Sequence, residues 1–486
     1  MPFAVVSIQF EGVLYIYNNK SMRAEDFISH EEILRCISFA KENKSNIPLL
    51  RKITDKARER KGLSYTEASV LLQCDVPEIN EEIKAVAQEI KRDFYGNRIV
   101  MFAPLYLSNY CVNGCVYCPY HAKNGHIPRK KLTQEEIRLE VMALQDMGHK
   151  RLALETGEDP ENCPIEYVLE SIETIYGIRH KNGAIRRVNV NIAATTVENY
   201  RKLKGAGIGT YILFQETYHK ESYEKLHPSG PKHDYAYHTE AMDRAMEGGI
   251  DDVGLGVLFG LEDNAYELAG LLMHAEHLEA VHGVGPHTIS VPRIRRADDI
   301  DPSKFEKGID DETFAKIISI IRIAVPYTGM IVSTRESREC REKVLKLGVT
   351  QISGGSRTSV GGYCEENPDN GSAQFEVSDN RTLDEVVNWL IKSGYIPSFC
   401  TACYREGRTG DRFMQLCKSG QIQNCCHANA LMTLKEYSED YASHDTAEAA
   451  NTLIIAETEN IPSGKVKEIV KENLINIVAG KRDFRL

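Results

Sequence analysis

An alternation of apolar runs with amphipathic helical stretches constrains the fold of this chain more than any other feature of its sequence. Eight candidate strands follow one another, at residues 99–107, 151–155, 187–193, 210–215, 252–259, 288–292, 330–334 and 350–353. Their number and spacing favour an α/β fold of the (β/α)8 TIM-barrel type. An open doubly wound sheet is the alternative, but no G-x-G-x-x-G run opens a helix here.

The stretches between the candidate strands carry helix start and stop signals. In residues 133–147, Thr133 and Glu136 are placed to form a capping box, and Gly148 marks the end. The apolar side chains that share one face of this helix are Ile137, Val141 and Leu144. Residues 165–176 have the same periodicity. The sequence therefore places helices that can cover a sheet between its strands.

The sequence pattern on either side of the candidate barrel differs from the alternation of strands and helices within it. Residues 22–97 have a helical pattern and predict a helical N-terminal region before a barrel at 98–362. A stretch rich in Gly, Asn, Asp and Ser then predicts a linker or long loop, and it opens a C-terminal domain at 363–486. Residues 1–21 are an extension that could be a strand, a disordered tail, or sequence upstream of a start at Met22.

Composition and charge narrow the possible partners. A formal net charge of -11 argues against a nucleic-acid partner. The 13 cysteines cluster in metal-like spacings, which favours a reducing compartment: the cytoplasm, or an organelle if the host is a eukaryote. No apolar run is long enough to span a bilayer, and Glu11 interrupts the apolar N-terminus, so we expect no membrane association and no signal peptide.

Three cysteines directly after the first candidate strand predict an iron–sulfur site. Cys111, Cys115 and Cys118 have the spacing C-x3-C-x2-C, and with Tyr117 they match the C-x3-C-x-aromatic-C pattern of radical S-adenosylmethionine (SAM) enzymes. Three thiolates can hold three irons of a 4Fe–4S cube and leave the fourth open for SAM. The alternative is a zinc knuckle or unrelated buried thiols, although zinc usually takes four ligands.

Polar residues at other strand ends predict the rest of this site, because barrel enzymes place their chemistry on the loops that follow the strands. Thr156, Gly157 and Glu158 end the second strand and could accept hydrogen bonds from the ammonium group of SAM, unless they form an ordinary loop. The candidate catalytic residues are Gln215 and Glu216 after the fourth strand and Arg335 after the seventh. Arg335 could bind a substrate carboxylate, or it could form a structural pair with Glu336 or another carboxylate.

A second metal site is predicted in the C-terminal domain. Cys400 and Cys403 have the spacing C-x2-C, and the third cysteine could be Cys417, Cys425 or Cys426. Zinc bound with His427, a second open cluster, and a disulfide between Cys400 and Cys403 are all compatible with this spacing. A reducing compartment disfavours the disulfide.

From about residue 31 to the C-terminus, the chain resembles the HydG family, the radical SAM tyrosine lyases of FeFe-hydrogenase maturation. The runs that carry this resemblance are residues 109–115, 188–196, 285–293 and 400–405. It implies a radical SAM barrel with a 4Fe–4S cluster at each mouth. It also implies that L-tyrosine is cleaved between Cα and Cβ to p-cresol and dehydroglycine, which then breaks into CO and cyanide.

The resemblance also assigns individual residues and partners. The family spacing C-x2-C-x22-C selects Cys400, Cys403 and Cys426 for the auxiliary cluster, and His287 fits the histidine that holds an additional, dangling iron with free L-cysteine. A lone histidine at a strand start would otherwise be structural. Implied partners are a ferredoxin- or flavodoxin-type electron donor, the other hydrogenase maturation proteins and FeFe-hydrogenase. Pro119 stands where we expect glycine in the family.

Two other functions stay in competition. One is a tyrosine lyase of the 2-iminoacetate synthase type for thiamine biosynthesis, which stops at dehydroglycine and lacks the C-terminal cysteine set. The other is a non-enzymatic scaffold that carries Fe–S clusters, which has no need of Thr156, Gly157, Glu158 or Arg335.

Overall fold

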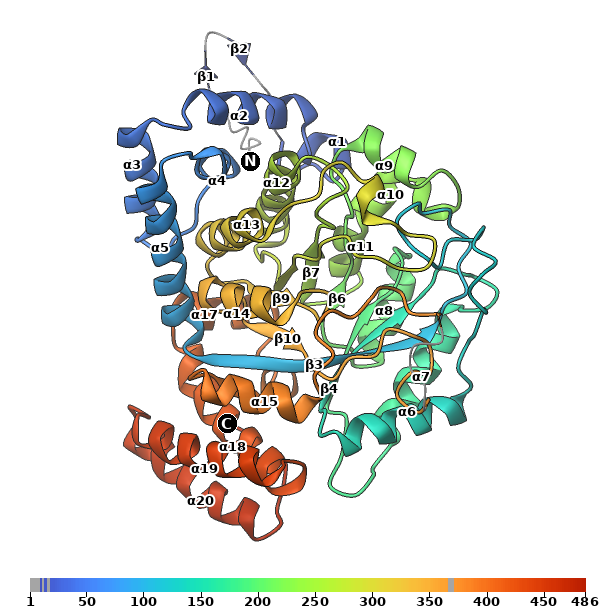
Figure 1. Cartoon of the computed structure of the whole chain (residues 1–486), viewed down its shortest axis with the longest axis vertical. Coiled ribbons are helices and arrows are strands. Elements are labelled where there is room, and N and C mark those ends of the chain that lie inside the picture. Colours follow the sequence, from blue (N-terminus) through green and yellow to red (C-terminus); the bar gives the residue numbers. More distant parts are fainter. Residues whose placement is uncertain (1–8, 11–12, 15–17, 366–370) are drawn as a thin grey trace.

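The computed structural model describes residues 9–10, 13–14, 18–365 and 371–486. Eight parallel strands form its centre: β3 (Arg98–Ser108), β4 (Arg151–Thr156), β5 (Arg187–Asn191), β6 (Tyr211–Ile212), β7 (Val253–Gly256), β8 (Thr288–Ser290), β9 (Gly329–Val332) and β10 (Gln351–Ser353). Each strand pairs with the next, and β10 pairs with β3, so the sheet closes into a barrel. The predicted (β/α)8 fold is confirmed (Figure 1).

Helices cover the outside of the barrel: α6 (Gln134–Asp146), α7 (Ile165–Gly177), α8 (Val197–Gly205), α9 (Lys220–Leu226), α10 (Tyr235–Thr239), α11 (Ala241–Glu247), α12 (Asn264–His282), α13 (Asp311–Ala324), α14 (Arg338–Leu347) and α15 (Leu383–Lys392). The capping box predicted for α6 is present, with Thr133 and Glu136 bonding to each other's backbone N–H groups.

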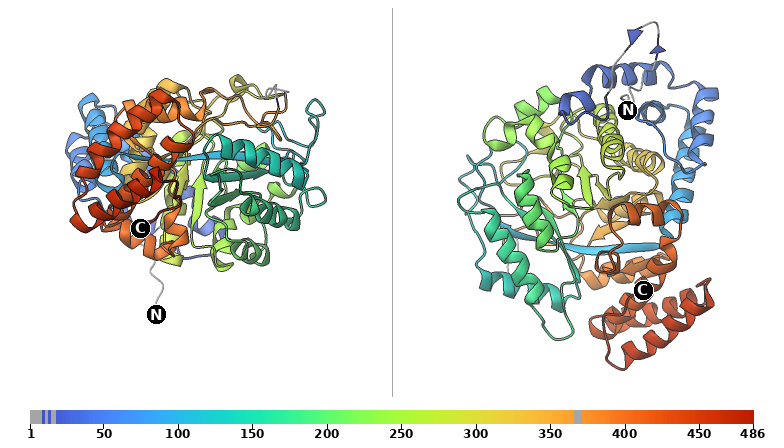
Figure 2. Two further views of the ribbon diagram at one scale, coloured as in Figure 1. Left: turned by 90° about the horizontal axis from the view of Figure 1, so that it is seen from below. Right: turned by 180° about the vertical axis from the view of Figure 1, so that it is seen from behind.

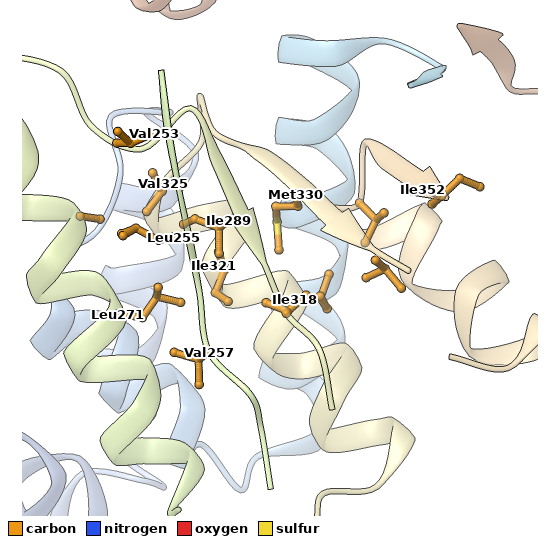
Figure 3. Close-up of a cluster of buried hydrophobic side chains, with 14 of the residues drawn as sticks. Val253, Leu255, Val257, Leu271, Ile289, Ile318, Ile321, Val325, Met330 and Ile352 are labelled. Atoms are coloured by element: carbon orange, nitrogen blue, oxygen red, sulfur yellow. The ribbon is translucent and has the colours of Figure 1, made fainter. Parts of the chain in front are cut away.

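The core lies between strands and helices because strand residues alternate in direction. Val253 and Leu255 on β7 point outward and pack in a cluster with Leu271 of α12 and Ile321 of α13 (Figure 3). The alternate β7 position at Gly256 faces inward, where a Cβ would lie 2.4 Å from Phe214. The small residue leaves room for that ring inside the barrel.

Five helices precede the barrel: α1 (Ala24–Phe27), α2 (His30–Glu42), α3 (Ile47–Ala57), α4 (Tyr65–Gln73) and α5 (Pro77–Tyr95). They pack beside α12, α13 and α14, as the blue ribbons of Figure 1 show. The short strands β1 (Gln9–Phe10) and β2 (Val13–Leu14) pair antiparallel. Most of the predicted extension at 1–21 lies outside the described residues.

The C-terminal region begins with β11 (Ile396–Ser398), which pairs with residues Arg98 to Val100 at the start of β3. Five helices follow: α16 (Ala402–Arg405), α17 (Gly410–Lys418), α18 (Ile422–Asp440), α19 (His444–Glu459) and α20 (Gly464–Val478). The last three form a layer at the periphery of the barrel (Figure 2). This pairing places Cys400 at the mouth where the barrel strands begin, opposite the loop that carries Cys111.

Residues 371–380 contain no helix or strand, as the composition of this stretch predicts. The loop lies over the mouth where the strands end, because the Tyr106 hydroxyl of β3 donates to Gln374 Oε1 at 2.8 Å. The boundaries predicted at 97/98 and 362/363 stay predictions. Among the described helices, none combines the length and apolarity needed to cross a membrane.

Candidate active site

The three cysteines after β3 lie together on one cavity of about 150 Å³ at the mouth where the strands end. Cys111, Cys115 and Cys118 all line it, and Pro119 lines it beside them. Their loop is fixed by side-chain contacts to its own backbone. Arg129 donates to the carbonyl oxygens of Asn109 and Tyr120, among others, and these contacts hold the shape of the loop.

The end of β4 lies directly against this cysteine loop. The N–H of Val112 donates to Glu158 O at 2.8 Å. A Cβ at Gly157 would lie 2.1 Å from Tyr110 O and 3.0 Å from Cys111 Cβ. Only glycine allows this close approach, so Gly157 sets the distance between the cysteine loop and the β4 end.

Thr156, Gly157 and Glu158 line the same cavity as the cysteines. Glu158 Oε2 accepts a hydrogen bond of 2.6 Å from Asn113 Nδ2. Burial raises the pKa of Glu158, opposed by this hydrogen bond. The β4 end therefore presents a hydroxyl, an open backbone and a carboxyl group to the space beside the cysteines.

The two candidates on the fourth strand end point in different directions. Glu216 lines the cavity, and its Oε1 accepts 2.6 Å from Lys232 Nζ. It has a φ of +68°, which is rare for a residue with a side chain and is common at functional sites. Gln215 does not line the cavity, because its Nε2 donates to Thr239 Oγ1 outside the barrel. This placement removes Gln215 from the candidate catalytic residues.

Tyr117 stands at the edge of the cysteine cavity. Its hydroxyl lies 2.6 Å from His227 Nε2, and the two rings meet edge to face. Burial lowers the pKa of His227 to about 3, so this imidazole is neutral near pH 7. The contact fixes the tyrosine ring as a wall of the cavity.

Arg335 lies inside the barrel mouth and is not paired with Glu336. Glu336 instead binds Arg293 and Arg295. The Arg335 guanidinium stacks 3.6 Å from the centre of the Phe375 ring and lines the cavity. The structural pair considered from the sequence is therefore absent, and this cation is left facing the interior.

Glu155 and Lys232 also line the cavity, although neither was predicted from the sequence. Glu155 is at the end of β4 and lines the cavity; burial raises its pKa to about 8, opposed by Arg335. Lys232 reaches the cavity from the segment after α9. Position on a strand end was a usable signal for Glu155, whereas no local pattern marked Lys232.

The cysteine set fits a 4Fe–4S cluster better than a single zinc ion. The cavity is lined by three cysteines and by no histidine. Within the described part of the chain, no three His, Cys, Asp or Glu side chains converge on a single-ion position. Three thiols that each bind a different iron need not converge on one point, whereas zinc ligands do.

A second group of cysteines lies at the opposite mouth of the barrel, around a cavity of about 70 Å³ that we call the auxiliary chamber. It is lined by Cys400, Cys403 and Cys426, together with His287. His287 precedes β8, and its Nε2 lies 3.0 Å from the hydroxyl of Tyr404. Burial lowers the pKa of His287, which keeps the imidazole neutral and able to bind a metal.

The remaining C-terminal candidates lie elsewhere. Cys417 and Cys425 do not line the auxiliary chamber. His427 points away from it, toward Glu457, whose carboxylate lies 3.4 Å from Nε2. A zinc site built with His427 therefore has no support in this geometry, and the three chamber cysteines again fit an open cluster. All 13 cysteines are unpaired, so no disulfide joins Cys400 to Cys403.

The barrel interior contains a third cavity, of about 90 Å³, between the two sites. It shares Glu155, Phe214 and Arg335 with the upper cavity. It shares Gln351 with the auxiliary chamber. The two cysteine sites are thus at opposite ends of a chain of cavities that runs through the barrel.

Comparisons with known proteins agree with this arrangement. Residues 105–275 match the radical SAM superfamily, and residues 290–396 match the biotin and thiamin synthesis associated domain. The chain is 31% identical over 347 residues to 2-iminoacetate synthase of Salmonella typhimurium, covering 71% of this chain and 88% of that protein.

Two solved structures extend the likeness to nearly the whole chain. A crystal structure of HydG, a maturase of the [FeFe]-hydrogenase, has a TM-score of 0.92 and 55% identity, over 95% of this chain and all of that one. The maturase HydG from Carboxydothermus hydrogenoformans has a TM-score of 0.79 and 36% identity, over 93% of this chain and 99% of that one.

Proposed function

The chain belongs to the radical SAM enzymes, in the family that includes HydG and 2-iminoacetate synthase, and we propose that it is an L-tyrosine lyase of FeFe-hydrogenase maturation. In this proposal it cleaves tyrosine between Cα and Cβ to p-cresol and dehydroglycine. It then forms CO and cyanide at the auxiliary site.

One observation carries this proposal. Two separate sets of three cysteines line cavities at opposite mouths of one barrel, and an interior cavity lies between them. A lyase that stops at dehydroglycine needs only the upper site. A cluster carrier needs no interior cavity between the two.

At the upper site, Cys111, Cys115 and Cys118 would hold the 4Fe–4S cluster. When bound there, the cluster would supply the electron that cleaves SAM. This cleavage makes hydrogen abstraction from the substrate possible. Thr156 and Glu158, which line the same cavity, would accept hydrogen bonds from the ammonium group of SAM. Tyr117 lines one side of the space.

Tyrosine is proposed to bind deeper, where the upper and interior cavities overlap. The guanidinium of Arg335 has no ion pair among the described residues and would bind the substrate carboxylate. Glu155 in its protonated form does not repel that carboxylate. Glu216, held by Lys232, would orient the substrate amino group.

At the lower site, Cys400, Cys403 and Cys426 would hold the auxiliary cluster, and His287 would hold the dangling iron together with free L-cysteine. That group supplies a metal that collects CO and cyanide. The surrounding chain contributes charge: Arg98 and Arg151 line the auxiliary chamber and favour anionic occupants. A ferredoxin- or flavodoxin-type donor, the other maturation proteins and FeFe-hydrogenase are the proposed partners, in the cytoplasm or an organelle.

The test is an anaerobic incubation of the reconstituted protein with SAM, dithionite and L-tyrosine. The proposal predicts p-cresol together with CO and cyanide. Formation of p-cresol without CO would instead support the 2-iminoacetate synthase type. Absence of 5'-deoxyadenosine would support a non-enzymatic cluster carrier.

A further inference from the structure

The backbone at Glu216 has an unusual conformation for a residue that lines the upper cavity. Its φ is +68°, and the N–H of Thr217 donates to Gln215 O at 2.9 Å across it. A hydrogen bond from residue i+2 to residue i across a positive φ is typical of the classic γ-turn, which is rare and strained. Such a turn persists only where the surrounding structure holds it. The contacts on its two sides therefore decide where the Glu216 carboxylate points.

The chain that leads into this turn is held by the barrel. The N–H of Gln215 donates to Gly256 O at 2.9 Å, and the N–H of Leu258 donates to Glu216 O at 3.1 Å. Strand β6 itself ends at Ile212. The residues that follow the turn therefore need partners from outside the sheet.

Glu267 of α12 supplies these partners and is 0% exposed. The hydroxyl of Thr217 donates to its Oε1, and the N–H of Tyr218 donates to its Oε2 at 2.9 Å. The Thr217 hydroxyl in turn accepts the N–H of His219, which caps the start of α9, at 3.1 Å. One carboxyl group thus ties three consecutive residues to a single helix, directly or through Thr217.

Helix α12 lies close enough to make these bonds because it has a glycine at the contact. A Cβ at Gly270, three residues after Glu267, would lie 2.5 Å from Cβ of Tyr218. The missing side chain lets the helix approach the segment that follows the turn. The Tyr218 ring then runs along α12, where its hydroxyl lies 3.1 Å from His274 Nδ1.

We propose that Glu267 is a positioning residue of the upper site, which anchors the backbone after Glu216 to α12 and so holds the Glu216 carboxylate in the cavity. This inference rests on the proposed function, in which Glu216 orients the substrate amino group. Glu267 is not among the described residues that line the cavity, so it acts through Glu216. The bond between Glu216 Oε1 and Lys232 Nζ depends on this anchor.

The first test needs no turnover. Crystal structures of the full-length, anaerobically reconstituted wild type and of Glu267→Leu compare the φ of Glu216 and its contact with Lys232. Leucine fills the space but accepts no hydrogen bond, so we expect Glu216 to leave the positive φ and its contact with Lys232 to open. An unchanged Glu216 in the variant would overturn the proposal, whatever the substrate of the enzyme.

The second test measures the KM for tyrosine and the ratio of 5'-deoxyadenosine to p-cresol in the presence of SAM and dithionite. Glu267→Leu should raise both by about tenfold, because a displaced Glu216 no longer orients the amino group. Glu267→Gln can still bond to the Thr217 hydroxyl and the Tyr218 N–H, so it should stay within about threefold of the wild type.

Tyr218→Phe is the matched control. It removes a buried contact between the same segment and the same helix, at His274, but leaves the bonds to Glu267 in place. Its KM and product ratio should match those of the wild type. Changes in Tyr218→Phe as large as those in Glu267→Leu would overturn the proposal.

A double-mutant cycle separates positioning from stability. Glu216→Gly removes the carboxylate and tolerates the positive φ, so adding Glu267→Leu to it should change the KM by less than about twofold. Additive effects would return Glu267 to a structural role. If Glu267→Leu does not fold, Thr217→Val, which lacks the hydroxyl, takes its place in the crystals and in the cycle. A wild type that forms no p-cresol would contradict the lyase proposal alone, and the crystal structures would then decide this one.

Discussion

The contact between Gly157 and the cysteine loop allows a sharp test of the upper site. In Gly157→Ala, the new Cβ would lie 2.1 Å from Tyr110 O. A relaxed carbon–oxygen contact needs about 3.3 Å, so the loop and the β4 end must separate by roughly 1 Å. Such overpacking costs about 1–3 kcal/mol of stability, and a shift of this size next to a reacting group lowers the rate by about 100-fold.

The assay is the rate of 5'-deoxyadenosine release with SAM and dithionite, measured together with iron content and the free energy of unfolding. Gly177→Ala at the end of α7 is the matched control, because nothing lies within 4 Å of its added Cβ. We expect the control to behave as the wild type and Gly157→Ala to retain its auxiliary cluster but lose SAM cleavage. A wild-type rate in Gly157→Ala would refute the argument that this glycine sets the position of the cysteine loop.

Three further predictions address the other parts of the site. Cys403→Ser should still release p-cresol but lose CO, measured by trapping the gas with haemoglobin; a normal CO yield would remove the auxiliary role. Arg335→Lys should raise the KM for tyrosine about tenfold, because the ammonium group lacks the planar fork, and an unchanged KM would return Arg335 to a structural role. The pKa of Glu155 is raised by burial to about 8, so the folded protein keeps a proton that the unfolded chain loses near 4.5, and stability falls as pH rises between these values. Above pH 8 the ionised Glu155 repels the substrate carboxylate, so KM should rise in the wild type but stay flat in Glu155→Gln; parallel profiles would contradict this.

The barrel could be predicted from sequence because its signals are local. Eight apolar runs, and features such as the capping box of Thr133 and Glu136, each specify one element. Strand ends were less certain: the fourth predicted strand, 210–215, is only Tyr211–Ile212 in the structure. Regular strand geometry stops after Ile212, and Glu216, further along the chain, has a positive φ.

The cysteines of both sites could be identified from the sequence, because the spacing of cluster-binding cysteines along the chain is a recognisable motif. The direction of single side chains could not. Gln215 and Glu216 are neighbours of similar polarity, yet Glu216 lines the cavity and Gln215 bonds to Thr239. Both lie beyond the end of β6, and Glu216 has a positive φ, so no strand periodicity could predict their directions.

Contacts between side chains from distant segments could not be predicted from local sequence patterns. Lys232 reaches Glu216 across a loop. The alternative pair between Arg335 and Glu336 does not form, because Arg293 and Arg295 bind the Glu336 carboxylate instead.

Electron paramagnetic resonance of the anaerobically reduced protein tests the central claim of two independent clusters most directly. The account predicts two 4Fe–4S signals: one that shifts when SAM is added and disappears in Cys115→Ala, and one that is indifferent to SAM and disappears in Cys403→Ala. A single signal, or the loss of both signals in either variant, would contradict it.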